Sequence, residues 1–312
     1  MFSEGSRRAV AVSLGTLIVF IVKAMTPAQK LREVLVGPAL EVIPGCFDAL
    51  SAKLVADAGF KVTFMSGFAV SAARLGLPDT GLISFAEMLD SLRNCASGAA
   101  RILLIGDGDT GYGNALNVQR TVVEYARAGA AAVMIEDQVS PKKCGHTRGK
   151  QVIGRDEARM KIRAAIDARR DADILILART DARAVHGFDE ALNRCRDFET
   201  EGADIIFLEA PENELEMRRF CQAMCKPCMA NMVPGGKTPI LPPQELQSIG
   251  YKLALYPVVL MSSAIAAMQA ALAALRPESK KAFPPTVSFA ELQQVVGFPD
   301  YWERETRYKA SD

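Results

Sequence analysis

The stretch DILILARTDARAVHGFDEALNRCRDFETEGADIIFLE, residues 173–209, contains the pattern that decides the fold. Its two short apolar runs, DILILAR and DIIFLE, flank DEALNRCRDFETEGA, which has the spacing of an amphipathic helix and a glycine near its end. This alternation predicts a strand, a helix and a second strand parallel to the first. Each apolar run ends in a charged residue, Arg179 or Glu209.

The same alternation extends over the rest of the chain from residue 25 onward. Strands are predicted at 40–44, 61–65, 101–106, 131–136, 173–179, 204–209, 228–232 and 252–257. Helices are predicted between them, among others at 47–59, 117–130, 155–170 and 189–203. Eight strands that alternate with helices are typical of an α/β fold, the (β/α)8 TIM-type barrel. A doubly wound open sheet would alternate in the same way.

Polar residues at the strand ends favour the closed barrel. Barrel active sites gather at the carboxyl ends of the strands and in the loops that follow them. Six successive predicted strands end in such residues: Ser66 and Gly67, Asp107 and Asp109, Glu136 and Asp137, Arg179 and Asp181, Glu209, and Asn231. These side chains converge better around a ring than along an open sheet, so we expect one catalytic site at the barrel mouth.

Composition narrows the classes of function. The 37 Lys and Arg residues balance 36 Asp and Glu, which excludes an extended basic surface for nucleic acid and favours a small-molecule role. Seven cysteines at irregular spacings do not fit a disulfide framework. The C-x-x-C pair at 225 and 228 is interpreted as packing thiols. We therefore expect a reducing, cytoplasmic compartment.

The amino terminus is the exception to this picture. Residues 9–22, AVAVSLGTLIVFIV, form an apolar run shorter than the ~20 residues of a membrane-spanning helix and close to a signal-peptide core. No small-x-small cleavage site follows it. We expect residues 1–24 to be an apolar leader, either dispensable or acting as an organelle-targeting signal or membrane tether. Residues 25–312 are expected to form a single catalytic domain.

Asp107 and Asp109 are candidate metal ligands. They stand two positions apart where a strand ends, so in extended backbone both side chains would point the same way. Carboxylate oxygens in this arrangement suit Mg²⁺ or Mn²⁺, and Glu136 lies one strand away. Asp-Gly-Asp is also ordinary turn chemistry, and that alternative stays open.

The remaining strand-end residues permit a binding site for an acid. Glu136, Arg179, Glu209 and Asn231 are individually ordinary, and a buried Glu-Arg ion pair is a common structural arrangement. Together, a metal and the guanidinium could hold a carboxylate and a neighbouring oxygen, while the Asn and Glu side chains hydrogen-bond the rest of the ligand.

The basic stretch PKKCGHTRGK, residues 141–150, surrounds a cysteine, Cys144. Cys144 and His146 are too few for a closed zinc site. The nearby cations would stabilise a thiolate at Cys144; they are Lys142, Lys143, His146 and Arg148. Two glycines, Gly145 and Gly149, would allow the loop to move. A mobile cationic lid that carries a thiol and a solvated basic loop are both consistent with this composition.

Eight motifs carry a resemblance to a known family. They are SGFAVSA (66–72), PDTG (78–81), DGDTGYGN (107–114), IEDQ (135–138), PKKCGH (141–146), ARTDA (178–182), LEAPE (208–212) and NMVPGGKTP (231–239). In this order the chain resembles the isocitrate lyase and phosphoenolpyruvate mutase superfamily over residues 25–310. It looks most like the short lyase branch that includes methylisocitrate lyase, 2,3-dimethylmalate lyase and petal death protein.

The resemblance implies a barrel that depends on Mg²⁺, or alternatively Mn²⁺, and acts on small dicarboxylates. Asp107 matches the direct metal ligand, while Asp79, Asp109 and Glu136 match carboxylates that hold the metal largely through water. The resemblance implies substrate contacts from Ser66, Gly67, Phe68, Gly145, Arg179 and Asn231. It implies catalytic roles for Lys142, Cys144, His146, Arg179 and Glu209. Of these, Lys142, Cys144 and His146 match the family's gating loop, as does Gly145.

The cysteine in the gating loop indicates the lyase branch. The implied reaction breaks the C2–C3 bond of a substituted malate and releases a 2-oxo acid. The other product leaves as the enediolate of a carboxylic acid, which Cys144 would protonate as general acid. Two departures from methylisocitrate lyases, Phe64 in place of a Tyr and Phe68 in place of a Gly, point to a smaller, malate-like substrate.

Two alternatives to the lyase function remain open, and an oligomeric assembly is expected. Oxaloacetate hydrolysis or carboxyphosphonoenolpyruvate mutase-like chemistry is the second enzymatic interpretation, and the run 9–22 alone suggests a non-catalytic membrane-tethered scaffold. The segment SFAELQQVVGFPDYWERETRY, residues 288–308, resembles helices that this superfamily exchanges between subunits. We therefore expect a homo-oligomer, a tetramer by resemblance.

Overall fold

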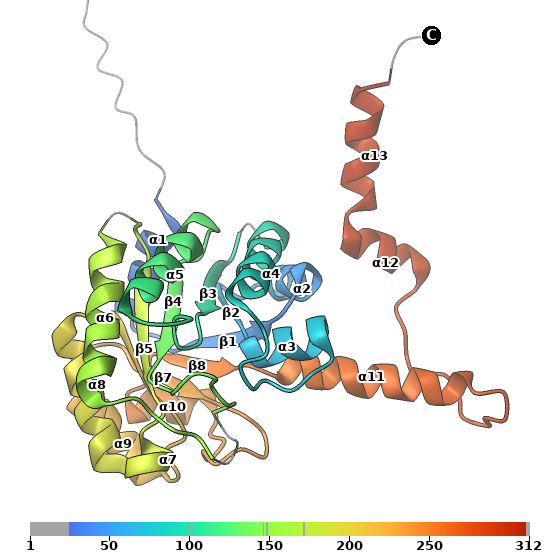
Figure 1. Ribbon diagram of the computed structural model, residues 1–312. Coiled ribbons are helices and arrows are strands. Elements are labelled where there is room, and N and C mark those ends of the chain that lie inside the picture. The colour runs from blue at the N-terminus through green and yellow to red at the C-terminus, as the bar shows by residue number, and fades with distance from the viewer. Residues whose placement is uncertain (1–24, 100, 146, 148, 171, 310–312) are drawn as a thin grey trace, which may run out of the picture.

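Eight parallel strands form the barrel seen in the computed structural model, which describes residues 25–99, 101–145, 147, 149–170 and 172–309 (Figure 1). The strands are β1 (Glu41–Cys46), β2 (Val62–Met65), β3 (Leu103–Asp107), β4 (Ala132–Glu136), β5 (Leu175–Thr180), β6 (Ile205–Leu208), β7 (Met229–Asn231) and β8 (Leu253–Tyr256). Each lies within a residue or two of its predicted range. The leader expected at residues 1–24 and the side chain of His146 lie outside the described residues.

The strand order shows that the sheet closes on itself. The hydrogen-bonded order is β6-β5-β4-β3-β2-β1-β8-β7, so the first and last strands of the chain are neighbours. Between the described residues of β6 and β7, a parallel bridge joins Ile206 to Cys228, and the Ile206 amide donates to the Pro227 carbonyl at 2.9 Å. The predicted barrel is therefore confirmed, and the doubly wound open sheet is wrong.

Alternation along each strand divides the core into two parts. Side chains such as Ile105, Met134, Leu177 and Phe207 point into the barrel and pack on one another. Their neighbours along the strands, such as Val133, belong to the cluster shared with the outer helices. α1 (Pro27–Val36) adds apolar side chains to the interior cluster and covers the end of the barrel opposite the strands' carboxyl ends.

The outer helices follow the predicted βα order. They are α2 (Ala49–Asp57), α3 (Gly67–Leu75), α4 (Phe85–Gly98), α5 (Ala115–Arg127), α6 (Arg155–Arg169), α7 (Arg183–His186), α8 (Phe188–Glu201), α9 (Glu214–Ala223) and α10 (Pro243–Ile249). Local signals fix several of their starts: Asp48, Ser84 and Asn114 each accept from the third residue of the following helix, which closes a capping box. The helices predicted at 47–59, 117–130, 155–170 and 189–203 are confirmed.

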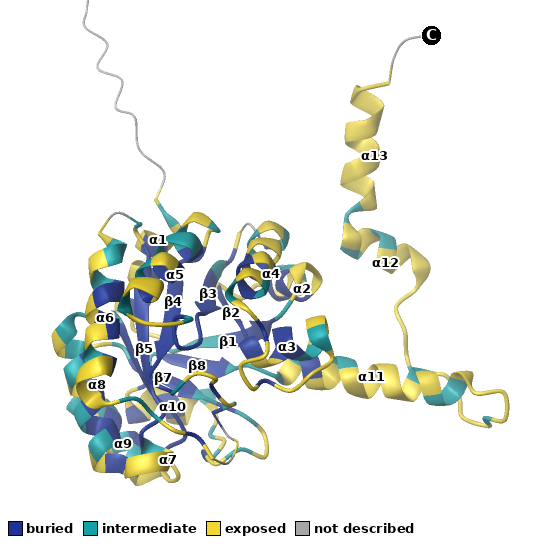
Figure 2. Cartoon of the chain, viewed as in Figure 1, coloured by how far each residue is buried: buried dark blue, intermediate teal, exposed yellow. Residues whose placement is uncertain are grey.

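The carboxyl-terminal helices extend away from the barrel as an exposed arm (Figures 1 and 2). The arm consists of α11 (Val259–Leu275), α12 (Phe289–Val296) and α13 (Phe298–Arg307). Within the described chain, Met261 is the one residue of the arm that is buried. Large apolar side chains are exposed along it: Ile265, Met268, Leu272, Leu275, Phe289, Leu292, Val296, Tyr301 and Trp302. Throughout residues 25–309 as described, the helices are too short or too polar to cross a membrane.

Leu177→Ala tests the interior of the barrel. Leu177 is fully buried, so the substitution removes apolar contacts and leaves a cavity, and we expect the free energy of unfolding to fall by about 2–5 kcal/mol. Leu215→Ala on α9 is the matched control, because Leu215 is 68% exposed and its loss should change stability by about 0.5 kcal/mol or less. Denaturant titration measures both, and equal effects would contradict the assignment of the interior.

Candidate active site at the barrel mouth

A cavity of about 200 Å³ lies at the carboxyl ends of the strands. Its wall includes most of the residues predicted from the sequence: the apolar Phe68, and Ser66, Asp79, Asp107, Lys142, Cys144, Gly145, Arg179, Glu209 and Asn231, which are mostly polar. The rest of the wall is largely apolar: Phe64, Met134, Phe207, Val233, Leu255, Pro257 and Val258, with the Ser262 hydroxyl among them. The structure thus brings together in one cavity side chains from seven of the strands or the loops after them.

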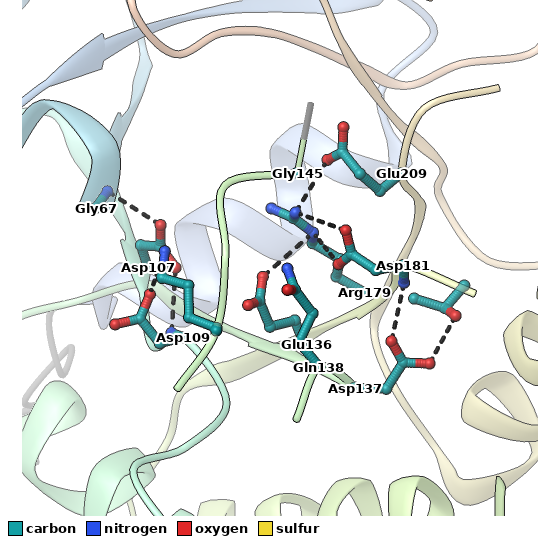
Figure 3. Close-up of polar contacts among 12 residues, drawn as sticks. Gly67, Asp107, Asp109, Glu136, Asp137, Gln138, Gly145, Arg179, Asp181 and Glu209 are labelled. Carbon is teal, nitrogen blue, oxygen red and sulfur yellow. Dashed lines mark hydrogen bonds and ion pairs between the residues drawn. The ribbon is translucent and has the colours of Figure 1, made fainter. Parts of the chain in front are cut away.

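Asp107 ends β3 and is held from two sides. Its Oδ2 accepts from the Gly67 amide at 3.0 Å, at the first residue of α3, and its Oδ1 accepts from the Asp109 amide at 3.1 Å (Figure 3). A Cβ on Gly67 would lie 2.7 Å from Asp107 Oδ2, so this approach requires glycine. Burial raises the pKa of Asp107 to about 6, and the charge of Asp109 adds to the rise.

Asp109 lies in a turn, and the expectation of an extended backbone there is wrong. Its φ is +47°, in the left-handed region, and the preceding Gly108 packs so closely on β4 that a Cβ would lie 2.6 Å from the Met134 carbonyl oxygen. The Asp-Gly-Asp sequence therefore forms a turn, as the alternative interpretation of this motif expected. The turn still leaves the Asp109 carboxylate close enough for its charge to raise the pKa of Asp107.

Lys142 lies between two of the predicted metal-site carboxylates. Its Nζ is 2.6 Å from Asp79 Oδ1 and 2.9 Å from Asp109 Oδ1, and all three side chains are buried. Burial alone would lower the pKa of Lys142, but the nearby carboxylates, led by Asp109, outweigh burial and raise it well above the usual value. Lys142 is therefore a permanent positive charge at the cavity wall.

Arg179, near the end of β5, is the centre of a second ionic group (Figure 3). Its Nε and Nη2 donate to the two oxygens of Asp181 at 2.9 and 3.1 Å. Nε also lies 3.4 Å from Glu136 Oε2, and Nη2 lies 3.5 Å from Glu209 Oε2. Its guanidinium stands over the ring of Phe207, 5.3 Å from the ring centroid. The buried ion pair considered at the sequence level is present, and the same guanidinium lines the cavity.

Glu209 and Asn231 come from adjacent strands and contact each other. The Asn231 amide donates to Glu209 Oε1 and Oε2 at 3.3 and 3.2 Å. Ser66, in contrast, caps a helix: it precedes α3 and its hydroxyl accepts from the Ala69 amide at 3.4 Å. All three residues line the cavity.

The segment 141–145 lies over this ionic group. A Cβ on Gly145 would lie 2.4 Å from Arg179 Nη2 and 2.9 Å from Glu209 Cδ, so the Gly145 backbone packs directly on both side chains. Cys144 lines the cavity and is half-buried, and its thiol forms no disulfide. The start of the segment is tied down by Gln138, whose side chain accepts from the Lys143 amide and donates to the Lys143 carbonyl.

Three residues of the site had no role in the sequence-based prediction. Asp181 and Asp137 were noted merely as strand-end residues, and Lys150 as one cation of the basic stretch. Asp181 is fully buried and accepts from Arg179 and from Lys150 Nζ. Asp137 accepts from the Asp181 amide at 2.9 Å and from Thr180 and Arg194, so it fixes the backbone after β5. For Asp137 and Asp181, the available signal was their position directly after strands β4 and β5, whereas Lys150 had no such signal.

The site carries an excess of negative charge. Among the described residues, six buried carboxylates, those of Asp79, Asp107, Asp109, Glu136, Asp181 and Glu209, surround three cations, Lys142, Lys150 and Arg179. Among the described residues, Glu136 Oε1 is buried and accepts no hydrogen bond, and burial raises the pKa of Glu136 well above its usual value. Within the same residues, no three His, Cys, Asp or Glu side chains are arranged to enclose a metal by themselves.

Comparison with known proteins gives a consistent set of relatives. The family described as phosphoenolpyruvate phosphomutase matches residues 31–276. The 2,3-dimethylmalate lyase of Eubacterium barkeri is 42% identical over 286 residues, which cover 91% of this chain and 99% of that protein.

Solved structures agree with these sequence relatives. An oxaloacetate acetylhydrolase in complex with the inhibitor 3,3-difluorooxalacetate superposes with a TM-score of 0.87 at 34% identity, covering 92% of this chain and 99% of that one. A phosphonopyruvate hydrolase in complex with oxalate and Mg²⁺ superposes with a TM-score of 0.79 at 31% identity, covering 91% and 99%.

Proposed function

This chain belongs to the phosphoenolpyruvate mutase and isocitrate lyase superfamily, and from that premise we propose that it is a Mg²⁺-dependent carbon–carbon lyase of a substituted malate. The observation that carries the proposal is the shared cavity: Cys144 lines the same small space as Asp107 and Arg179. A thiol above an acid-binding site provides a proton donor where a carbanion would form.

The two parts of the cavity wall match the two parts of such a substrate. Arg179, Lys142 and Asn231 offer positive charge and hydrogen-bond donors for carboxylate groups. Phe64, Val233 and other apolar side chains line the same cavity and would contact alkyl substituents. A cavity of about 200 Å³ has room for a small acid, and Phe64 and Phe68 both line it. The 42% identical relative is named for 2,3-dimethylmalate.

The residues present fit a divalent cation. Six carboxylates against three cations leave the site short of positive charge, and carboxylate oxygens are the ligands that Mg²⁺ prefers. We propose that Asp107 holds the ion directly and that Asp79, Asp109 and Glu136 hold it through water. The absence of three enclosing ligands among the described residues is compatible with this, because Mg²⁺ usually keeps several waters. When bound, the ion would stabilise the negative charge that develops on the substrate oxygens.

The reaction then divides among the protein's own groups. Arg179 binds and orients a carboxylate of the substrate, and a general base takes the proton of the C2 hydroxyl as the C2–C3 bond breaks. The electron pair of that bond moves to C3 and is delocalised into the adjacent carboxylate as an enediolate. Cys144 donates its proton to C3, which yields the carboxylic acid beside the 2-oxo acid. The Gly145 backbone, packed on Arg179 and Glu209, keeps bulk water from the enediolate.

A second candidate is hydrolysis of oxaloacetate. It is supported by the TM-score of 0.87 to an oxaloacetate acetylhydrolase. A panel of 2-hydroxy and 2-oxo diacids with Mg²⁺, read by mass spectrometry of the products, distinguishes the two. Release of pyruvate or glyoxylate from malates supports the lyase, whereas inert malates and oxalate as product support the hydrolase.

Cys144→Ser tests the proton donor. A serine hydroxyl is a far weaker acid than a thiol, so we expect release of the 2-oxo acid from the active malate to fall by about 10²–10⁴-fold. Cys225→Ser is the matched control, because Cys225 is an exposed free thiol away from the cavity, and it should leave the rate unchanged. Full activity in Cys144→Ser would show that the thiol is not the proton donor.

Removal of the metal gives a second test. Dialysis against EDTA should reduce turnover to background, and added Mg²⁺ or Mn²⁺ should restore it. Asp107→Asn removes the proposed direct ligand, and we expect it to weaken Mn²⁺ binding, measured by calorimetry, by at least about tenfold. Asp90→Asn on the exposed face of α4 is the control. Unaltered Mn²⁺ affinity in Asp107→Asn would contradict the assigned ligand.

We also propose that the exposed arm packs against further copies of this chain. The apolar residues of α11 are followed by others on α12 and α13, which monomeric proteins rarely expose together. Light scattering of the full chain should give a multiple of 33.7 kDa, a tetramer if the resemblance holds. Leu272→Glu on α11 should lower that mass, whereas Leu215→Glu on α9 should not. A monomeric mass for the unaltered chain would contradict the proposal.

A further inference from the structure

Lys150 ends the basic stretch and returns its side chain into the protein. The side chain is 2% exposed, and its Nζ contacts two oxygens: the Gly145 carbonyl at 2.5 Å and Asp181 Oδ1 at 2.7 Å. Gly145 belongs to the cavity wall, and Asp181 is the carboxylate that holds Arg179. Lys150 therefore joins the basic stretch to the ionic group beneath it.

Burial of the Lys150 ammonium group is tolerated only if the group stays hydrogen-bonded. A buried charge is strongly unfavourable unless it is paired and hydrogen-bonded, so the Nζ must keep both of its oxygen partners. Of the two, Asp181 is fixed independently by Arg179 and by its own amide, which donates to Asp137. The other partner, the Gly145 carbonyl, belongs to a loop. The ammonium group therefore keeps this partner only while the loop stays in its present position.

The contact between Lys150 and the Gly145 carbonyl bears on the position of the loop over Arg179. Gly145 lies so close to Arg179 Nη2 and Glu209 Cδ that a Cβ there would be 2.4 and 2.9 Å away. Cys144 precedes it, so a loop that moved away from Lys150 would also withdraw the thiol from the cavity. We infer that Lys150 is a positioning residue, which fixes the Cys144–Gly145 segment over Arg179 by holding the Gly145 carbonyl against Asp181.

The loop provides a matched control. Lys143 is in the same stretch, and its Nζ donates to the Gly149 carbonyl at 2.9 Å, but the side chain is exposed and does not line the cavity. Lys143→Met and Lys150→Met thus remove the same charge and one lysine-to-loop hydrogen bond each. Lys150→Met differs in that it also removes the partner of the Gly145 carbonyl and the buried ion pair to Asp181.

The first measurement is the rate at which iodoacetamide alkylates Cys144 in the substrate-free enzyme, resolved by peptide mass spectrometry. Lys150→Met should raise that rate several-fold while leaving the alkylation of exposed Cys225 unchanged, whereas Lys143→Met should raise neither rate, because losing a nearby cation can only disfavour the reactive thiolate. A merely structural loss would raise alkylation of the buried thiols Cys46 and Cys95 as well. An unchanged rate at Cys144 in folded Lys150→Met would overturn the inference.

The second measurement is turnover, and here the inference rests on the proposed lyase function. Misplacement of Cys144 should lower kcat of Lys150→Met by about tenfold or more with little change in KM, because Arg179 still binds the substrate. If none of the diacids is turned over by the unaltered enzyme, the proposed function fails, but the alkylation rate still decides the role of Lys150.

Lys150→Arg covers the case in which Lys150→Met does not fold. Arginine keeps the positive charge beside the buried Asp181, but its planar guanidinium is larger than an ammonium group and binds oxygen in a different geometry. We expect faster alkylation of Cys144 in this variant too. Wild-type alkylation and wild-type kcat in Lys150→Arg would show that the contact to Gly145 does not position the thiol.

Discussion

The burial of a single guanidinium, that of Arg179, is the constraint on which the site depends. An unpaired charge in this position would be strongly unfavourable, so carboxylates from neighbouring strands must lie around it. Glu136 from β4, Glu209 after β6 and Asp181 after β5 meet this requirement. The barrel brings these strand ends together, and the ion pairs in turn fix where each side chain points. Any ligand that binds Arg179 enters an arrangement that is already in place.

Much of this arrangement could be predicted because an apolar run has a recognisable end. Arg179 and Glu209 were found as the first charged residues after buried strands, and the barrel places all such ends at one mouth. The contact of Lys150 with Asp181 could not be found in this way, because it joins residues 31 positions apart that share no local pattern. The backbone at Asp109 was mispredicted for a related reason: the tight packing of Gly108 on β4, which imposes the turn, is a tertiary contact.

The arm connects assembly to the site by covalent continuity. Val258 and Ser262 line the cavity, and α11 continues from them into the exposed part of the arm (Figure 1). Its amino-terminal turn is therefore part of the pocket wall, while its later turns carry the apolar side chains exposed to solvent. The direction in which α11 leaves the barrel thus determines both the shape of the pocket and the surface available to another subunit.

Asn231 lines the cavity and also takes part in the contact between β6 and β7, where the barrel closes. The backbone joins these strands through the bridge from Ile206 to Cys228, whereas β4 and β5 are paired over five positions. Further along the same two strands, the Asn231 amide binds both oxygens of Glu209. This side-chain contact supplies cross-strand bonding where the backbone supplies little. The two residues expected to bind a ligand therefore also bond across the seam of the barrel, so a change of Asn231 that alters the pocket also removes a cross-strand contact at that seam.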